Sequence, residues 1–221
     1  MSIETLRAFA CISIRWFANP SVNCVDSSLY TREPMKGEFF MEKPIKYVFY
    51  AIEGYGEVEY DITGEELKNL WKICAQYSEY LSFSFMRYHD TIAFEKELEA
   101  FRVSDMDVIS RCMKHSGYYN WYLRLSVEER AKFLQNELKF YRVCPELLAL
   151  LSQIADGIFK FMDGEYPNPE DPTFYRADGS VFLHSIIHEG EVYLCPREDE
   201  DVSSILSNPL WQVFKNPYIR E

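Results

Sequence analysis

Residues 173–195 read TFYRADGSVFLHSIIHEGEVYLC, and this stretch decides the fold class. Asp178-Gly179 is a preferred dipeptide for a type I′ turn between two strands, and Glu189-Gly190 is a weaker form of the same signal. The runs on either side of both turns are rich in β-branched and aromatic residues, which favour strands. The stretch therefore predicts a three-stranded antiparallel meander.

The alternation of side chains along a strand divides this meander into two faces. With a two-residue turn at Glu189-Gly190, His184 would lie opposite Cys195. The expected core face carries Val181, Leu183, Ser185, Ile187, Val192 and Leu194. The other face carries Phe182, His184, Ile186, His188, Glu191, Tyr193 and Cys195. This second face is half apolar and half ionisable, which is unusual for a face exposed to solvent. It therefore indicates a surface that is covered, either by another part of the chain or by a partner.

A second hairpin and several helices are predicted upstream of the meander. Residues 46–52 and 57–62 alternate around a Gly-rich turn, which indicates a β-hairpin, and residues 80–88 are strand-like. Thr63 with Glu66, and Ser126 with Glu129, have the spacing of a capping box, which marks the start of a helix. Helices are also expected over residues 90–102 and 104–115. The chain therefore predicts an α+β fold, with helices packed on a mostly antiparallel sheet and a C-terminal three-stranded meander.

Three of the expected helices have an assignable apolar face. The helix after Thr63 would place on one side Leu67, Leu70, Trp71, Cys74 and Tyr77. The helix after Ser126 would place Val127, Ala131, Leu134, Leu138 and Tyr141 on one side. The helix from Pro145 to Met162 is apolar on most sides, which predicts the central element of the core. Residues 1–162 are thus expected to form a mixed α+β core domain. Residues 163–221 are expected to form an acidic meander and tail packed on the same core.

The negative charge of the chain is concentrated near its C-terminal end. The net charge of the 221 residues is −12, and the segment from Asp163 to Asp201 holds 11 acidic and two basic residues, which is −9 of that total. A local negative field attracts a basic partner and repels nucleic acid. The segment therefore favours a basic protein partner and no direct contact with nucleic acid.

His184, His188 and Cys195 are the candidates for chemistry. If His184 and Cys195 are cross-strand neighbours, they could form a thiol–imidazole pair, which can activate a nucleophile; the alternative is an ordinary cross-strand contact. His184 and His188 have a spacing that lets two histidines share a metal on a helix, but on a strand it separates them by about 13 Å. The predicted strand therefore indicates no metal site. No cofactor motif is present, and no cofactor is expected.

The six cysteines are scattered along the chain with no CxxC pair. They are Cys11, Cys24, Cys74, Cys112, Cys144 and Cys195. A chain of this length does not need disulfides to fold, so reduced thiols are expected. Neither a secretion signal nor an apolar run of membrane-spanning length is recognisable. These features predict a cytoplasmic protein with no membrane contact.

These observations favour a non-enzymatic binding protein that blocks a basic protein, such as a nuclease or a nucleic-acid-binding complex. Immunity proteins, antitoxins and phage or plasmid inhibitors are proteins of this type. The expected partner-binding residues are Glu189, Glu191, Tyr193, Glu198, Asp199, Glu200 and Asp201. Two alternatives stay open: a small hydrolase or transferase with a His/Cys site near the meander, and an adaptor subunit of a larger assembly.

Overall fold

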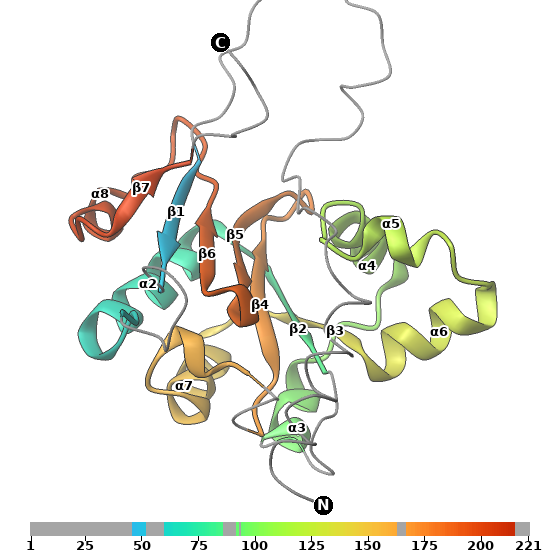
Figure 1. The fold of residues 1–221 in the computed structure, drawn as a ribbon. Helices are drawn as coiled ribbons and strands as arrows, with labels where there is room; N and C mark the ends of the chain where they lie inside the picture. The colour runs from blue at the N-terminus through green and yellow to red at the C-terminus, as the bar shows by residue number, and fades with distance from the viewer. Residues whose placement is uncertain (1–45, 52–59, 86–91, 93, 163–166, 215–221) are drawn as a thin grey trace, which may run out of the picture.

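A seven-stranded antiparallel sheet forms the centre of the protein (Figure 1). The computed structural model describes residues 46–51, 60–85, 92, 94–162 and 167–214. The strands are β1 (Tyr47–Tyr50), β2 (Tyr80–Ser84), β3 (Leu138–Arg142), β4 (Glu170–Tyr175), β5 (Val181–Ile186), β6 (Glu191–Leu194) and β7 (Trp211–Val213). Their order across the sheet is β3-β2-β4-β5-β6-β1-β7. The predicted α+β fold is confirmed, and β4, β5 and β6 form the predicted meander.

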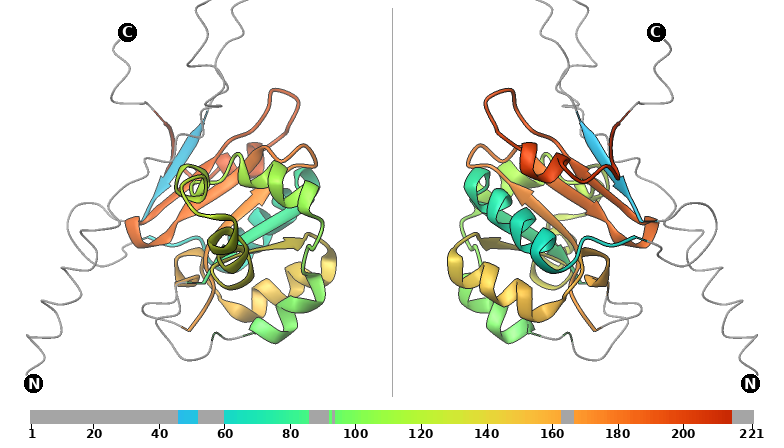
Figure 2. Two further views of the ribbon diagram at one scale, coloured as in Figure 1. Left: turned by 90° about the vertical axis from the view of Figure 1, so that its right-hand side faces the viewer. Right: turned by 90° about the vertical axis from the view of Figure 1, so that its left-hand side faces the viewer.

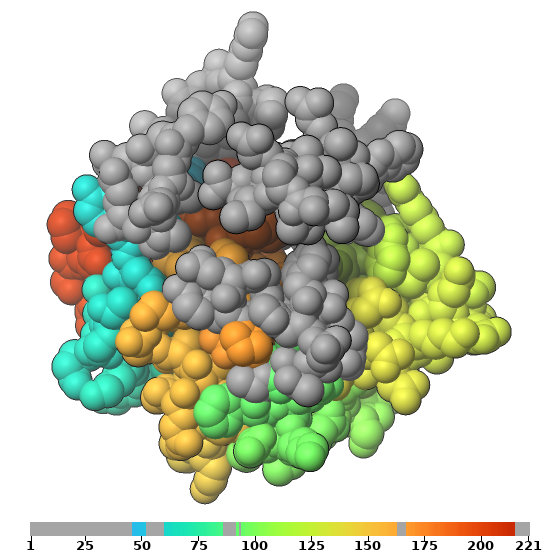
Figure 3. All heavy atoms as spheres, turned by 60° about the horizontal axis from the view of Figure 1, so that its bottom comes forward, coloured from blue at the N-terminus to red at the C-terminus, as the bar shows by residue number. Residues whose placement is uncertain are grey.

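Helices cover both faces of this sheet. Within the described residues they are α2 (Gly64–Tyr77), α3 (Glu95–Leu98), α4 (Met106–Met113), α5 (Tyr119–Tyr122), α6 (Val127–Asn136), α7 (Pro145–Ile154) and α8 (Ser203–Leu206). The two side views show α4, α5 and α6 in front of one face, and α2 and α7 in front of the other (Figure 2). The space-filling view shows α2 and α7 as neighbours at the surface, with α6 at the opposite edge of the view (Figure 3).

Neighbouring residues on a strand supply the two separate cores. Phe174 and Tyr141 pack into the core beneath α2 and α7, whereas Tyr175 and Phe140 pack into the core beneath α4 and α6. This follows from the pleat of a strand, which points successive side chains to opposite faces. Strands that are buried on both faces are apolar at consecutive positions, and they lack the simple alternation of a half-exposed strand.

One of the two capping boxes is confirmed. At α6, the Ser126 hydroxyl accepts from the Glu129 N–H at 3.3 Å, and the Ser126 N–H donates to the Glu129 carboxylate at 2.8 Å. At α2, the helix begins where expected, but the Thr63 side chain makes no capping hydrogen bond. The Glu66 carboxylate instead accepts from the Asn208 side chain at 2.5 Å, so a tertiary contact takes the place of the cap.

Two expected helices are shorter than predicted. The helix after Ser126 ends at Asn136, and Leu138 and Tyr141 belong to the edge strand β3, because pairing with β2 overrides the helical pattern. Val127, expected on the apolar face, is 84% exposed. α7 ends at Ile154, before Gly157 packs so closely on Asp61 that a Cβ atom there would clash. α7 is an outer layer with one exposed side, so the sheet, and not α7, is the central element.

The other upstream predictions are confirmed in part. The strand-like run 80–88 contains β2, and the helix predicted over 104–115 contains α4. The first half of the predicted 46–62 hairpin contains β1, which pairs with β6 and β7. Residues 52–59 of that hairpin lie outside the described residues, as do 86–91 and 93 near the helix expected over 90–102.

The register of the β5–β6 hairpin differs from the expected one by two residues. His184 lies opposite Tyr193, not opposite Cys195. The reason is the turn: residues 187–189 form a 3-10 turn, and Gly190 has a positive φ of 71°, so four residues connect the strands instead of two. A shift of two residues leaves every side chain on its own face.

Val181 and Phe182, at the start of β5, are exceptions to the predicted faces. Val181, expected on the core face with Leu183, packs instead into the core beneath α4 and α6. The pairing of β4 with β5 is irregular between Phe174 and Tyr175, where Phe182 has no partner on β4. Phe182 therefore packs against Tyr77 of α2, with ring centroids 5.4 Å apart, and joins the core on the α2 side.

The thiols give a direct test of this packing. Cys74 and Cys112 are buried, and burial raises the pKa of both, to about 12 for Cys112, whereas Cys144 and Cys195 are partly exposed. Because the thiolate is the reactive form, we expect six thiols to react with a disulfide reagent in denaturant, and Cys74 and Cys112 to be protected in the folded protein. A count of four or fewer in denaturant without reductant would contradict the expectation of free cysteines.

Candidate functional site

Three exposed acidic side chains lie at the end of the sheet where β6 finishes. Glu198, Asp199 and Asp201 are exposed in the loop that connects β6 with α8. Glu189 is exposed in the turn at the opposite end of β6, and Glu191 is half-buried there. The predicted partner-binding residues therefore do not form one continuous patch.

Glu200 differs from its neighbours because it is buried in an ion pair with Arg176. The Arg176 guanidinium donates from Nε to Oε1 at 2.6 Å and from Nη2 to Oε2 at 2.5 Å. The side chains of both residues are only 7% exposed. Burial raises the pKa of Glu200, but the hydrogen bonds and positive charge of Arg176 outweigh it, and the pKa is lowered. Glu200, one of the expected partner-binding residues, is therefore occupied by an internal ion pair.

Arg176 also binds the ends of β5 and β6. Its guanidinium donates to the carbonyl of Val181 at 2.6 Å and to the carbonyl of Cys195 at 2.7 Å. The guanidinium also lies over the ring of Phe182, with Arg176 Cζ 5.3 Å from the ring centroid. Arg176 therefore joins the acidic loop to two strands through four charge-assisted hydrogen bonds.

Three further contacts hold the acidic loop. The Arg197 N–H donates to Glu200 at 2.7 Å, and the Asp201 N–H donates to the hydroxyl of Tyr77 at 2.9 Å. The Arg197 side chain forms an exposed ion pair with Asp178 of the β4–β5 turn. These contacts tie the loop to α2 and to the β4–β5 turn, and Glu198, Asp199 and Asp201 are exposed.

The structure disperses much of the charge that the sequence places in one segment. Glu170 and Asp171 are buried in β4, and Asp163 and Glu165 lie outside the described residues. Asp178 is paired with Arg197. The negative surface at the end of the sheet is therefore made by three side chains, those of Glu198, Asp199 and Asp201, and not by all eleven acidic residues of the segment.

His184 and Thr173 form a buried polar pair on the face toward α4–α6. His184 is 6% exposed, and its Nδ1 lies 2.9 Å from the Thr173 hydroxyl. Its ring stacks on Tyr193, and its Nε2 has no hydrogen-bond partner in the part of the chain that the structure describes. Burial, with a smaller effect from the Lys46 charge, lowers the pKa of His184 to about 4. His184 is therefore neutral at physiological pH.

Asp171 is a second buried ionisable group near this pair. Its φ of 53° is in the left-handed region, and its carboxylate accepts from the Ile187 N–H at 2.8 Å. Burial raises the pKa of Asp171 to about 7, while the Ile187 N–H and the Tyr118 hydroxyl oppose the shift and the charge of Glu189 adds to it. Neither Asp171 nor Thr173 was singled out by the sequence, because a buried carboxylate in a strand has no distinctive spacing.

Tyr193 and Glu191 form a hydrogen-bonded pair on β6. The Tyr193 hydroxyl donates to the Glu191 carboxylate at 2.5 Å, and the Tyr193 ring packs edge-on against Phe214. Burial raises the pKa of Glu191 and that of Tyr193. Tyr193 is half-buried, so part of its ring is available to a partner.

The structure does not bring together the histidines and the cysteine proposed for chemistry. His184 is opposite Tyr193, so Cys195 is only a diagonal neighbour. The His184 Nδ1 atom pairs with the Thr173 hydroxyl, and Nε2 has no hydrogen-bond partner among the described residues, so His184 makes no hydrogen bond to the Cys195 thiol. His188 is exposed in the turn after β5. Among the described residues, no three His, Cys, Asp or Glu side chains are grouped to hold a metal ion.

The class of protein that the structure defines is an α+β domain with one antiparallel sheet between two layers of helices. No family model matches the chain, and no curated protein or solved structure matches it. Within the described ranges, none of the helices has the length and apolar character needed to cross a membrane.

Proposed function

We propose that this chain is a non-enzymatic binding protein whose acidic loop, residues 196–201, engages and blocks a basic protein partner. The observation that carries the proposal is the set of hydrogen bonds from Arg176 to Glu200, Val181 and Cys195, which we call the Arg176 clamp. A buried arginine, bound to Glu200 and to two strand carbonyls, holds the loop in one conformation. Glu198, Asp199 and Asp201 are left exposed beside it.

A rigid acidic loop is suited to binding for two physical reasons. A cluster of like charges steers an oppositely charged partner and raises the association rate, an effect that salt screens. A loop that is already ordered loses little conformational entropy when it binds, so more of the contact energy appears as affinity. A freely moving acidic tail would supply the first effect but not the second.

A second acidic group, separate from the loop, lies at the other end of β6 and adds to the proposed surface. Glu189 and Glu191 add negative charge at the far end of that strand, and the half-buried ring of Tyr193 lies between the two acidic groups in the sequence. Aromatic residues of this kind anchor interfaces, because they bury a large area at low entropic cost. Nuclease toxins and nucleic-acid-binding complexes are proteins with basic sites of the complementary charge.

The test is charge reversal at the exposed acids alone. The partner is first isolated by affinity purification from cells that make the protein, and its association rate is then measured at low and high ionic strength. Replacement of Glu198, Asp199 and Asp201 by lysine should slow association about tenfold or more at low salt and reduce its salt dependence. Glu200 stays unchanged, because its reversal would place two positive charges together in a buried site.

A matched variant separates local charge from net charge. Replacement of Glu97, Glu128 and Glu137 by lysine changes the net charge by the same amount on other exposed surfaces. This control should bind the partner almost as the unmodified protein does, and thermal melts should show both variants folded. If both triple variants slow association equally, the acidic loop has no specific role and the proposal is wrong.

A further inference from the structure

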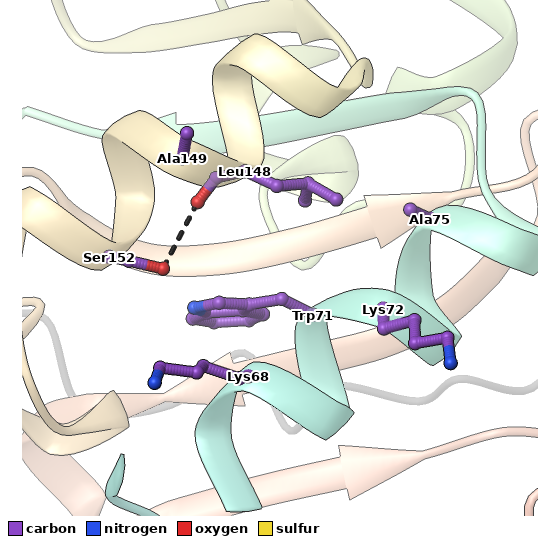
Figure 4. Close-up of a pocket in the computed structure, with 7 residues that line it drawn as sticks. All are labelled: Lys68, Trp71, Lys72, Ala75, Leu148, Ala149 and Ser152. Atoms are coloured by element: carbon purple, nitrogen blue, oxygen red, sulfur yellow. Dashed lines mark hydrogen bonds between the residues drawn. The ribbon is translucent and has the colours of Figure 1, made fainter. Parts of the chain in front are cut away.

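A groove of about 280 Å³ lies at the surface between α2 and α7 (Figure 4). Its walls are Lys68, Trp71, Lys72 and Ala75 of α2, and Leu148, Ala149 and Ser152 of α7. Alanine and serine are small, so the two helices leave space between them at these positions. The groove is mostly apolar and has positive charge along the α2 side.

The floor of the groove contains an unsatisfied hydrogen-bond donor. Trp71 is 2% exposed, and its ring packs against Phe161 and Phe174 with centroids 5.8 and 5.5 Å away. Its indole Nε1 has no hydrogen-bond partner among the described residues. A buried N–H without an acceptor is destabilising, so an acceptor that reaches it restores a favourable hydrogen bond.

Two other donors lie near the indole nitrogen. Figure 4 shows the nitrogen at the end of the Trp71 ring toward Ser152, with the amino group of Lys68 extended in the same direction. The Ser152 hydroxyl donates to the Leu148 carbonyl at 3.2 Å, a bond that rotation of the hydroxyl can exchange for another acceptor. Lys68 pairs with Glu65 at 2.5 Å, but both side chains are highly exposed, and such a pair is weak.

We propose that this groove binds a small ligand that carries a carboxylate on an apolar body. The carboxylate accepts from Trp71 Nε1, with Lys68 providing the compensating charge, and the apolar body lies on Ala75, Leu148 and Ala149. The indole nitrogen is buried, so side chains that line the groove shift when the carboxylate reaches it. The groove is close to the lower size limit of small-molecule sites, about 300 Å³, which favours a ligand of one ring.

The chemistry of the groove separates this ligand class from others. An amine is disfavoured, because Lys68 and Lys72 repel it and Trp71 offers it no acceptor. Inorganic phosphate satisfies the donors but has no apolar part to fill the groove. The inference does not depend on the acidic loop, so loss of partner binding and loss of ligand binding are separate results.

The indole N–H signals give a direct readout by NMR. The chain has four tryptophans, Trp16, Trp71, Trp121 and Trp211, and the Trp71 signal is assigned by its loss in Trp71→Phe. The probes are phenylacetate, the matched cation phenethylamine, and inorganic phosphate. Phenylacetate should shift the Trp71 indole proton downfield in a saturable manner, whereas phenethylamine and phosphate should leave it unchanged.

Two variants keep the inference testable if Trp71→Phe does not fold. Ala149→Leu, at an exposed position of α7, fills the groove and should abolish the shift. Lys68→Glu with Lys72→Glu should weaken phenylacetate binding about tenfold or more, whereas the matched double change Lys114→Glu with Lys132→Glu, at exposed positions of the opposite helical layer, should not. If phenylacetate shifts no indole signal, or if it still binds to the Ala149→Leu variant, the proposal is overturned.

Discussion

Replacement of Arg176 by methionine is expected to lower the free energy of unfolding by about 3–5 kcal/mol. The change leaves the Glu200 carboxylate buried without its positive partner and removes donors from the carbonyls of Val181 and Cys195. Removing one member of a buried ion pair is much more costly than replacing both members with neutral groups. The measurement is chemical denaturation at neutral pH.

Two comparisons isolate the cause of this loss. The double variant Arg176→Met with Glu200→Gln should regain part of the stability, because no uncompensated charge is left in the site. Arg197→Met removes the neighbouring exposed pair with Asp178 and should cost less than about 1 kcal/mol. If Arg176→Met costs no more than Arg197→Met, the clamp does not hold the loop in solution.

The second large effect is the dependence of folding stability on pH, to which two buried residues contribute with opposite signs. The pKa of Asp171 is raised to about 7, so the folded state binds its proton more tightly than the unfolded state does. The stability that this gives is complete below the unfolded pKa, near 4, and is lost as the pH rises through about 7. The pKa of His184 is lowered to about 4, so its contribution is complete above about 6.5 and is lost as the pH falls toward 4.

These opposite effects should be separable by substitution with asparagine. Relative to the unmodified protein, Asp171→Asn should gain up to about 4 kcal/mol as the pH rises from 4 to 7, since asparagine does not titrate and tolerates a positive φ. His184→Asn should gain up to about 3 kcal/mol as the pH falls from 6.5 to 4. In the unmodified protein the two slopes oppose one another between about pH 4 and 6.5.

Urea denaturation at a series of pH values measures both differences. Each variant is compared with the unmodified protein at the same pH, so contributions from the other ionisable groups cancel. The free energy of unfolding is plotted against pH for each variant. If the curves of the variants run parallel to that of the unmodified protein, Asp171 and His184 have the same pKa in the folded and unfolded states, and the prediction is wrong.

The sequence predicts the elements whose signal is local. The Ser126 capping box and the Gly190 turn depend on a few neighbouring residues, and both were identified correctly as the start of a helix and the site of a turn. The hydrophobic period also identified the buried side of α2. These are the features that short-range backbone chemistry determines.

The errors occur where tertiary contacts decide the structure. β3 follows directly from a helical pattern, and only its pairing with β2 makes it a strand. The Arg176–Glu200 pair joins residues 24 positions apart, so no spacing rule relates them. The expected partner-binding set includes Glu200, although the fold buries it in this ion pair, because a sequence counts charges but does not show which of them are neutralised inside the fold.

The strand order has a consequence for the way in which the chain is synthesised. β1 is the first strand that the structure describes, yet both of its neighbours, β6 and β7, come from residues after 190. Among the described residues up to 162, the only paired strands are β2 and β3. During synthesis β1 therefore cannot pair with β6 and β7 until residues beyond 190 have left the ribosome. Such long-range closure slows folding and prolongs the exposure of apolar strands.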